Sequence, residues 1–274
     1  MPIIAITREM GSLGRDVAQS LGEALRLPVV YHEVIDHLAD RLRVRKSHVI
    51  HLLDGSAGLL ERLTADRTSL SIFTIDEILA IAAKRGGAVI RGWGATQLLH
   101  DVPHAVCVRV CAPFELRKRR MMERVGSEDE PRVAEEIRIN DEAHNAIMRR
   151  HFAVQWTDPE HYDLVLNTKR VSVAECVAEV LALVRAPQFA ETERSRQKLD
   201  DLALAARVRA ALRRSPETRA AKVQVSSEAG RIVLSGAANT DEMLAFVEVA
   251  AAVPGVRDVA YRSHPGEEVR PRFH

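Results

Sequence analysis

The strongest constraint on the fold is the alternation of short apolar runs with helical patterns over the first 185 residues. Strands that alternate with helices form a parallel sheet, and helices cover both faces of such a sheet. The sequence therefore predicts an α/β domain of this kind. The expected strands are residues 3–7, 27–32, 88–92, 104–112 and 163–168, and the expected helices are 15–26, 33–53, 74–87, 113–125 and 173–185.

The remaining sequence predicts a second, smaller domain. Residues 186–200 are polar and show no apolar period, which is typical of a linker or an exposed helix. A helix at 202–214, a hairpin at 221–236, a helix at 241–253 and a strand at 254–264 then follow. This order predicts a small α/β sandwich of about 65 residues, near the lower limit for independent folding.

Composition excludes several classes of protein. The 274 residues carry a net charge of +1, which argues against nonspecific binding of nucleic acid. No apolar run reaches the roughly 20 residues that a membrane helix needs. Arg8 and Glu9 interrupt the first apolar run too early for a signal peptide. The three cysteines form no CxxC pair, which favours reduced thiols over a zinc site, and we expect a cytoplasmic protein.

The stretch "REMGSLGRD", residues 8–16, lies where a strand meets a helix, at the edge of the sheet that binds ligands in such folds. Gly11 and Gly14 leave room for backbone N–H groups to face a phosphate, and Ser12 offers a hydroxyl. Arg15 stands where a P-loop has lysine, and Asp16 where a hydroxyl would hold magnesium. From these residues alone, a nucleotide site and a plain strand-to-helix turn both remain open.

Three segments together resemble the cytidylate kinase-like family, a branch of the P-loop nucleoside monophosphate kinases. These are residues 3–35, "VCVRVCAPFELRKRRM" and "HYDLVLNTKRVSVAECVAEVL". The resemblance covers about residues 1–185, and a loop ending in Gly-Arg-acidic is usual there. It implies a P-loop kinase-like parallel sheet, with ATP and Mg²⁺ as cofactors and a nucleotide as substrate.

The resemblance also implies roles for individual residues. The residues expected to bind the donor nucleotide are Gly11, Ser12, Gly14, Arg15, Asp16 and Arg119, with Asp16 also near the metal. The residues expected to serve catalysis are Arg15, Arg117, Arg120, Arg138 and Asp141. Clustered arginines suit phosphoryl transfer, which depends on positioning and charge neutralisation.

Two positions depart from the family pattern. Trp93 stands where family members often have an arginine for the acceptor phosphate, and His144 stands where their lid usually has another. Arg91 lies close to Trp93, but the alternation of side chains along a strand argues against a simple replacement. Arg149 and Arg150 lie further along the chain and are candidates to compensate for the lid position.

Residues 201–264 resemble a BON domain, through the strand that ends in Leu-Ser-Gly and the later "VPGVRDV". The resemblance implies contact with a membrane or lipid and ligand sensing, while a regulatory or oligomerisation module is the slightly favoured alternative. The sequence shows no exposed apolar stripe or basic cluster that would require a membrane, and homo-oligomerisation stays open. The expected division of the chain is 1–186, a linker at 187–200, and a BON domain at 201–268.

Two functions from different classes follow from these observations. The first is an enzyme that transfers the γ-phosphoryl group of ATP to a nucleoside monophosphate, with CMP or dCMP favoured. The second is a degenerate kinase domain that binds a nucleotide and signals through the BON domain, which Trp93 and His144 favour. A kinase with a different acceptor is a third, weaker alternative.

Overall fold

The computed structural model describes residues 1–31, 38–39, 67–92, 94–220 and 222–263. The chain forms two compact units, and the first comprises Met1–Ala65 and Lys84–Thr192. The second comprises Asp66–Ala83 and Glu193–His274, so it includes one segment from the first half of the sequence. The expected division at residues 186 and 200 stays a prediction about the modules of the sequence.

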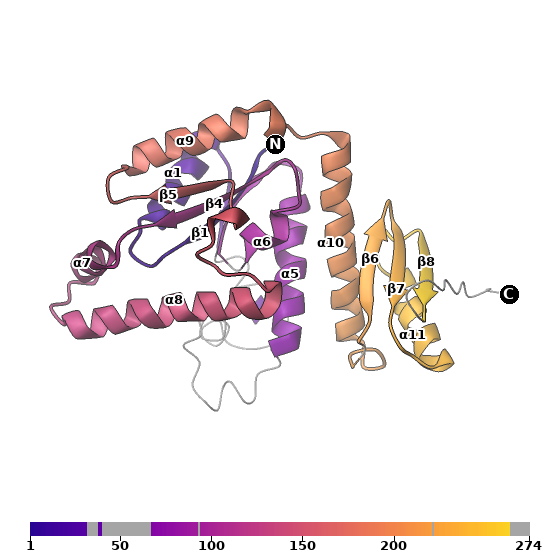
Figure 1. Ribbon diagram of the computed structural model, residues 1–274. Helices are drawn as coiled ribbons and strands as arrows, with labels where there is room; N and C mark the ends of the chain where they lie inside the picture. The colour runs from indigo at the N-terminus through magenta and orange to yellow at the C-terminus, as the bar shows by residue number, and fades with distance from the viewer. Residues whose placement is uncertain (32–37, 40–66, 93, 221, 264–274) are drawn as a thin grey trace. The chain divides into compact units, whose positions relative to one another are not determined.

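The first unit contains a five-stranded parallel sheet in the order β2-β3-β1-β4-β5 (Figure 1). Its strands are β1 (Ile3–Arg8), β2 (Val29–Val30), β3 (Ala88–Arg91), β4 (Ala105–Cys111) and β5 (Leu164–Asn167). Its helices are α1 (Gly14–Leu25), α6 (Ala95–Leu99), α7 (Phe114–Val125), α8 (Glu130–Phe152) and α9 (Val173–Arg185), with 3-10 turns η1 (Pro159–His161) and η2 (Pro187–Phe189). The predicted parallel sheet is confirmed.

Side chains of the central strands alternate between two helical layers, as expected for a sheet covered on both faces. Val106, Val108 and Val110 of β4 join the core that includes residues of α1 and α9. Cys107, on the other face of β4, donates its thiol hydrogen to the carbonyl oxygen of Thr96 in α6, at 3.2 Å. Burial on both sides explains why these strands are almost continuous apolar runs.

Several elements differ from their predicted extents. The 23-residue helix α8 and the short α6 were not predicted, because α8 is dominated by charged residues and only a narrow stripe of it is buried. The helix expected at 33–53 lies almost entirely outside the described residues. Helix α5 (Arg67–Ala83) begins seven residues earlier than predicted and ends just before Gly86 and Gly87, whose φ angles are +137° and +73°.

The second unit contains a mixed three-stranded sheet, which confirms the predicted small α/β domain. Strands β6 (Gln224–Glu228) and β7 (Arg231–Ser235) form the predicted antiparallel hairpin, and β8 (Asp258–Arg262) pairs with β7 in parallel. The turn residues Ala229 and Gly230 both have positive φ, at 49° and 86°, as a tight two-residue hairpin turn requires. Helices α10 (Glu193–Arg214) and α11 (Thr240–Ala251) supply apolar residues to its core.

Helix α10 is buried along two stripes. Leu204, Val208 and Leu212 belong to the core of the small sheet, whereas Ala203 and Ala206 are buried without belonging to it. Helix α5 lies beside α10 (Figure 1), and Arg213 of α10 donates to the hydroxyl of Ser69 in α5 at 2.7 Å. The residues 193–200, predicted as a linker or an exposed helix, therefore form the first turns of a packed helix.

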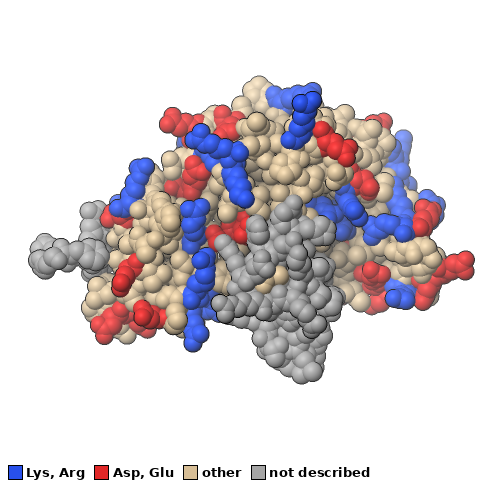
Figure 2. Space-filling view, turned by 180° about the vertical axis from the view of Figure 1, so that it is seen from behind, with Lys and Arg blue, Asp and Glu red and all other residues tan. Residues whose placement is uncertain are grey.

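The described surface carries charges of both signs. On the face shown in Figure 2, basic and acidic side chains are interspersed over the described residues. None of the helices in the described ranges combines the length and the apolar character needed to cross a bilayer.

The close packing of α1 against β2 depends on Gly22. A Cβ atom at this position would lie 2.4 Å from Cγ2 of Val29 and 3.0 Å from the carbonyl oxygen of Leu27. We therefore expect Gly22→Ala to lower the free energy of unfolding by about 1–3 kcal/mol, despite a helix-propensity gain of about 1 kcal/mol. Urea denaturation measures this change. Glu23→Ala, at an exposed site on the same helix, is the control, and a stabilised Gly22→Ala variant would contradict the close approach.

Candidate functional site

The loop between β1 and α1 requires glycine at two positions. Gly11 has φ +80°, and a Cβ atom there would lie 2.6 Å from the carbonyl oxygen of Arg117. A Cβ atom on Gly14 would lie 2.5 Å from Cβ of Arg8. Leu13, between them, also has a left-handed backbone, with φ 62°. The loop therefore wraps tightly against α7 and the end of β1, and larger residues at Gly11 or Gly14 would displace it.

The N-terminus of α1 is open. Leu13 is its N-cap residue and provides no side-chain hydrogen bond, and the first N–H groups of any helix have no acceptor within the helix. The helix dipole adds about half a positive charge at this end. These features make the loop and the first turn of α1 suited to hold an anion.

Ser12 anchors the loop to the sheet. Its side chain is fully buried, its hydroxyl donates to the carbonyl oxygen of Val110 at 3.0 Å, and its amide donates to the carbonyl oxygen of Glu9 at 3.1 Å. The hydroxyl hydrogen of Ser12 is therefore used within the protein, which argues against the predicted contact between this hydroxyl and a phosphate.

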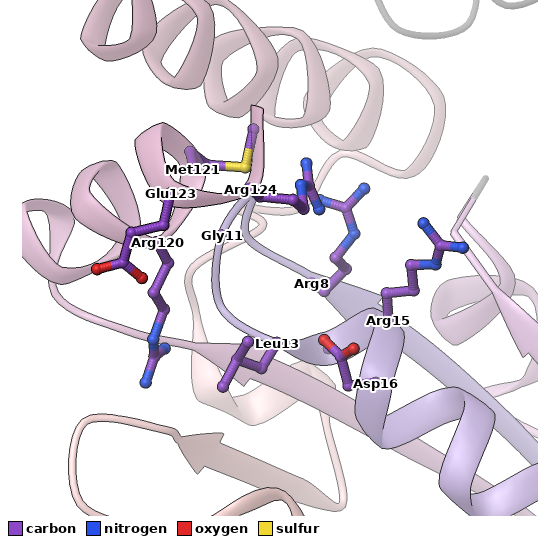
Figure 3. A pocket seen from close by; sticks show the side chains of 10 residues that line it. Arg8, Gly11, Leu13, Arg15, Asp16, Arg120, Met121, Glu123 and Arg124 are labelled. Atoms are coloured by element: carbon purple, nitrogen blue, oxygen red, sulfur yellow. The ribbon is translucent and has the colours of Figure 1, made fainter. Parts of the chain in front are cut away.

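A cavity of about 380 Å³ opens beside the loop (Figure 3). Figure 3 shows the side chains of Arg8, Arg15 and Arg124 extending to one side of the loop, while Arg120 points the other way. The first two helical residues after Gly14, Arg15 and Asp16, are exposed. The residues that line the cavity are Arg8, Gly11, Leu13, Gly14, Arg15, Asp16, Arg120, Met121, Glu123 and Arg124.

Arg8 and Arg124 are site residues that the sequence analysis missed. Arg8 is the last residue of β1, where ligands bind in parallel sheets, so its position in the motif was a usable signal. Arg124 lies four residues after Arg120 in α7, and this spacing places two side chains on one face of a helix.

Arg120 holds the loop from the side of β5. Its guanidinium group donates to the hydroxyl and to the carbonyl oxygen of Thr168, both at 2.9 Å. The Thr168 hydroxyl in turn donates to the carbonyl oxygen of Ser12 at 2.9 Å. Burial and the neighbouring Arg119 lower the pKa of Arg120. Arg120 thus both lines the cavity and fixes its edge.

Arg117, a predicted catalytic residue, is buried beneath the loop and does not line the cavity. It donates to the carbonyl oxygens of Ala112 at 3.0 Å and Met10 at 3.2 Å, and forms a two-point ion pair with Asp141 at 2.8 and 3.3 Å. Its Nε also lies 3.3 Å from a carboxylate oxygen of Glu9. Arg117 therefore positions the loop through its hydrogen bond to the backbone of Met10 and its contact with Glu9.

Glu9 completes this buried network from the sheet. Its carboxylate accepts from Arg109 of β4 at 2.6 Å and from the backbone N–H of Ala112 at 3.1 Å. Asp141 of α8 faces Arg117, and burial raises the pKa of Asp141 while the hydrogen bonds from Arg117 oppose the rise. We call Glu9, Arg109, Arg117 and Asp141 the loop-anchoring network. It joins β1, β4, α7 and α8 behind the glycine loop.

The two other predicted arginines lie outside the cavity. Arg119 is an exposed residue of α7. Arg138 is an exposed residue of α8, stands over the ring of Phe114 at 5.2 Å, and lines a shallower hollow with Phe114, Asp141, Glu142 and Asn145. The structure therefore brings Arg15, Asp16 and Arg120 together at the glycine loop but not Arg119 or Arg138.

Arg91 lies close to the loop. It is the last residue of β3, and Gly92 after it has φ +83°, so the alternation of side chains along the strand does not extend past position 91. The guanidinium group of Arg91 is near enough to Arg8, Arg15 and Asp16 for their charges to shift its pKa. Trp93 itself lies outside the described residues.

His144 packs inside the unit. Its Nδ1 donates to the carbonyl oxygen of Asn140 at 2.8 Å, and its ring stacks on that of Trp156 with 4.9 Å between centroids. Trp156 is 1% exposed and donates its indole N–H to Thr7 at 2.8 Å. His144 thus contributes to packing near the end of β1, and the exposed Arg149 and Arg150 lie one turn further along α8.

Among the described residues, no group of three or more His, Cys, Asp or Glu side chains could hold a metal ion. A single carboxylate is nevertheless adequate for Mg²⁺ bound mainly by phosphate oxygens and water. Asp16, exposed at the cavity wall, is suited to that role.

The sheet order β2-β3-β1-β4-β5, with a glycine loop between β1 and α1, defines a P-loop kinase fold. The model of the cytidylate kinase-like family matches residues 3–170, and the chain belongs to this family. The BON domain model matches residues 200–262, so the chain also carries a C-terminal BON domain. No curated protein matches the sequence.

Several solved structures are similar to the chain at low sequence identity. An uncharacterized protein from Eubacterium ventriosum is 21% identical with a TM-score of 0.53, covering 68% of this chain and 99% of the other. A shikimate kinase from Bacteroides thetaiotaomicron is 12% identical with a TM-score of 0.43, covering 68% and 99%. A gluconokinase from Sinorhizobium meliloti is 16% identical with a TM-score of 0.43, covering 67% and 91%.

The loop-anchoring network makes Arg117 a residue whose loss is costly. Replacing the buried Arg117 with leucine leaves the partly buried carboxylates of Glu9 and Asp141 without their shared partner, and we expect a loss of about 3–5 kcal/mol in the free energy of unfolding. The same substitution at the exposed neighbour Arg119 should change it by about 0.5 kcal/mol or less. Chemical denaturation of the two variants measures the contrast, and equal small losses would show that the network contributes little.

Proposed function

We propose that this protein transfers the γ-phosphoryl group of ATP, with Mg²⁺, to a nucleoside monophosphate, with CMP or dCMP as the favoured acceptor. The observation that carries the proposal is the open N-terminus of α1 beside a cavity lined by Arg8, Arg15, Arg120 and Arg124. Backbone N–H groups and clustered guanidinium groups together suit a triphosphate. Membership of the cytidylate kinase-like family supports nucleotide binding in general.

Different residues of the cavity would bind the donor phosphates and neutralise their charge. The backbone from Gly11 to Asp16 holds the donor phosphates, and Arg15 replaces the lysine of other P-loops with a planar, permanently charged group. Arg124 and Arg8, whose side chains extend to the same side of the loop as Arg15, would neutralise the charge that develops during transfer. Positioning and electrostatic stabilisation account for most of the catalysis of phosphoryl transfer.

Asp16 would hold Mg²⁺ together with phosphate oxygens. The bound ion would neutralise phosphate charge and orient the donor. Asp16 also stabilises α1 without any ion, because a carboxylate in the first turn of a helix interacts favourably with the dipole.

A second candidate function is a nucleotide-binding sensor that acts through the BON domain. The observation that favours it is the commitment of Arg117 and Asp141, two predicted catalytic residues, to each other beneath the loop. Because Arg117 and Asp141 bind each other, neither side chain would take part in phosphoryl transfer. The glycine loop and the arginines of the cavity would still bind an anion. The BON domain would then serve as a regulatory or oligomerisation module.

An ADP-release assay with Mg-ATP and a panel of nucleoside monophosphates distinguishes the two functions. We expect turnover that depends on one acceptor, and a loss of about 10²-fold or more in kcat/KM for Arg15→Ala, because this variant removes a phosphate-neutralising charge. Arg119→Ala, an exposed arginine outside the cavity, is the control. Nucleotide binding without acceptor-dependent ADP release would contradict the enzyme and leave the sensor.

The role of Asp16 has its own test. Asp16→Asn removes the charge but keeps the size, so we expect the Mg²⁺ concentration for half-maximal activity to rise by about tenfold. Titration of Mg²⁺ at fixed ATP measures it. Asp158→Asn, in the N-cap of η1, is a control carboxylate that does not line the cavity. An unchanged Mg²⁺ dependence in Asp16→Asn would contradict a role in binding Mg²⁺. Asp16 would then only stabilise the N-terminus of α1.

A further inference from the structure

Arg91 is a largely buried cation that rests on an aromatic ring. It ends β3, is 8% exposed, and its guanidinium group forms no hydrogen bond or ion pair within the part of the chain that the structure describes. It stands over the ring of Tyr31, 4.0 Å from the centroid. An aromatic ring supports a guanidinium group but leaves its N–H donors unused. Burying a charge in this way lowers stability unless a ligand compensates for it.

The surroundings of Arg91 add positive charge. Burial, followed by the charges of Arg8 and Arg15, lowers the pKa of Arg91 to about 10, whereas Tyr31 and Asp16 act in the opposite direction. Arg8 comes from the end of β1, and the parallel register that pairs Ile6 with Arg91 places the ends of these two strands side by side. Three guanidinium groups therefore converge where β1, β3 and α1 meet.

This cluster lies on one flank of the glycine loop. In the sheet order β2-β3-β1-β4-β5, the strand that carries Arg91 lies on the opposite side of β1 from β4 and β5. Arg120, bonded to Thr168 after β5, closes the other flank. Phosphoryl transfer requires the attacking and leaving oxygens on opposite sides of the moving group. A site with two cationic flanks around the loop meets this requirement.

We propose that Arg91, supported by Tyr31 and assisted by Arg8, binds the phosphate group of the acceptor on the β3 flank of the loop. The acceptor class is then a phosphate monoester, of which a nucleoside monophosphate is the example. This inference rests on the proposed function, which places the donor phosphates in the glycine loop.

The acid–base chemistry of the site agrees with a phosphate acceptor. A phosphate monoester is largely dianionic near neutral pH. Its oxygen attacks the γ-phosphorus of ATP, the bond from that phosphorus to the β,γ-bridging oxygen breaks, and ADP leaves with the electron pair. No proton has to be removed, so the reaction needs no general base. A hydroxyl acceptor would need one, and Asp141 is held by Arg117.

The charge of a dianion also fits the number of cations. Arg91 and Arg8 lie on adjacent strand ends, and two guanidinium groups can each donate to different oxygens of one phosphate. A neutral acceptor would leave the buried charge of Arg91 uncompensated, and a carboxylate offers half the charge. Binding of the phosphate would thereby offset the free-energy cost of burying Arg91 in the free protein.

Calorimetric binding of CMP without ATP, and of ATP without CMP, tests the inference in the full chain. We expect Arg91→Gln to raise the Kd for CMP by about tenfold or more and to leave that for ATP within about twofold. Arg91→Lys, which keeps the charge but loses the fork, should recover part of the CMP affinity. Inorganic phosphate should compete with CMP in the unmodified protein and lose this effect in Arg91→Gln.

The same samples separate a binding role from a structural one. Because Arg91→Gln removes an uncompensated buried charge, its thermal midpoint should not fall. A lowered midpoint with unchanged CMP affinity, or equal weakening of CMP and ATP, would overturn the proposal. So would the absence of binding of every nucleoside monophosphate and of inorganic phosphate to the unmodified protein.

The outcome also stays distinguishable from that of the proposed function. Binding of CMP that depends on Arg91, in a protein that releases no ADP above background, would keep this subsite and remove the kinase activity. Turnover that survives in Arg91→Gln with an unchanged KM for CMP would keep the kinase and overturn the subsite. Arg185→Gln, the same change at an exposed arginine at the end of α9, is the matched control for both measurements.

Discussion

The ion pair between Arg117 and Asp141 is the interaction on which the candidate site depends. It lies beneath the glycine loop, where Arg117 also binds the backbone of Met10 and approaches Glu9. Two buried guanidinium groups and two partly buried carboxylates lie together here, and each charge is tolerable only because the others are present. The loop therefore keeps one shape before any ligand arrives. A preorganised loop of this kind does not have to be ordered at the moment of binding.

Two kinds of arginine surround this loop, and burial alone does not separate them. Arg117 and Arg109 are as buried as Arg91, but each is matched by a carboxylate, whereas Arg91 rests on an aromatic ring. The matched arginines contribute to the architecture of the site. Arg91 has no carboxylate partner within the described part of the chain, and such local conflicts are typical of positions that bind ligands.

The sequence was sufficient to predict the parallel sheet, the glycine loop and the terminal hairpin, because each has a strong local signal. It was insufficient for α8, whose charged residues hide a narrow buried stripe, and for the first half of α10, which is buried by a segment more than a hundred residues away. The resemblance named Arg117 and Asp141, but their pairing depends on tertiary contacts between α7 and α8. Arg8, Arg124 and Arg91 were missed or misjudged because proximity in space, and not spacing along the chain, groups them.

The packing of α5 on α10 has a consequence for how this gene can be divided. Helix α5 immediately precedes the strand that carries Arg91, yet it belongs to the same compact unit as the C-terminal domain. Several of its side chains are buried, among them Leu70, Phe73 and Leu79, and the helix packs on α10. Helix α5, although it falls within the kinase-like part of the sequence, is thus built into the compact unit that contains the BON domain. A chain that ended before α10 would leave α5 without this partner helix.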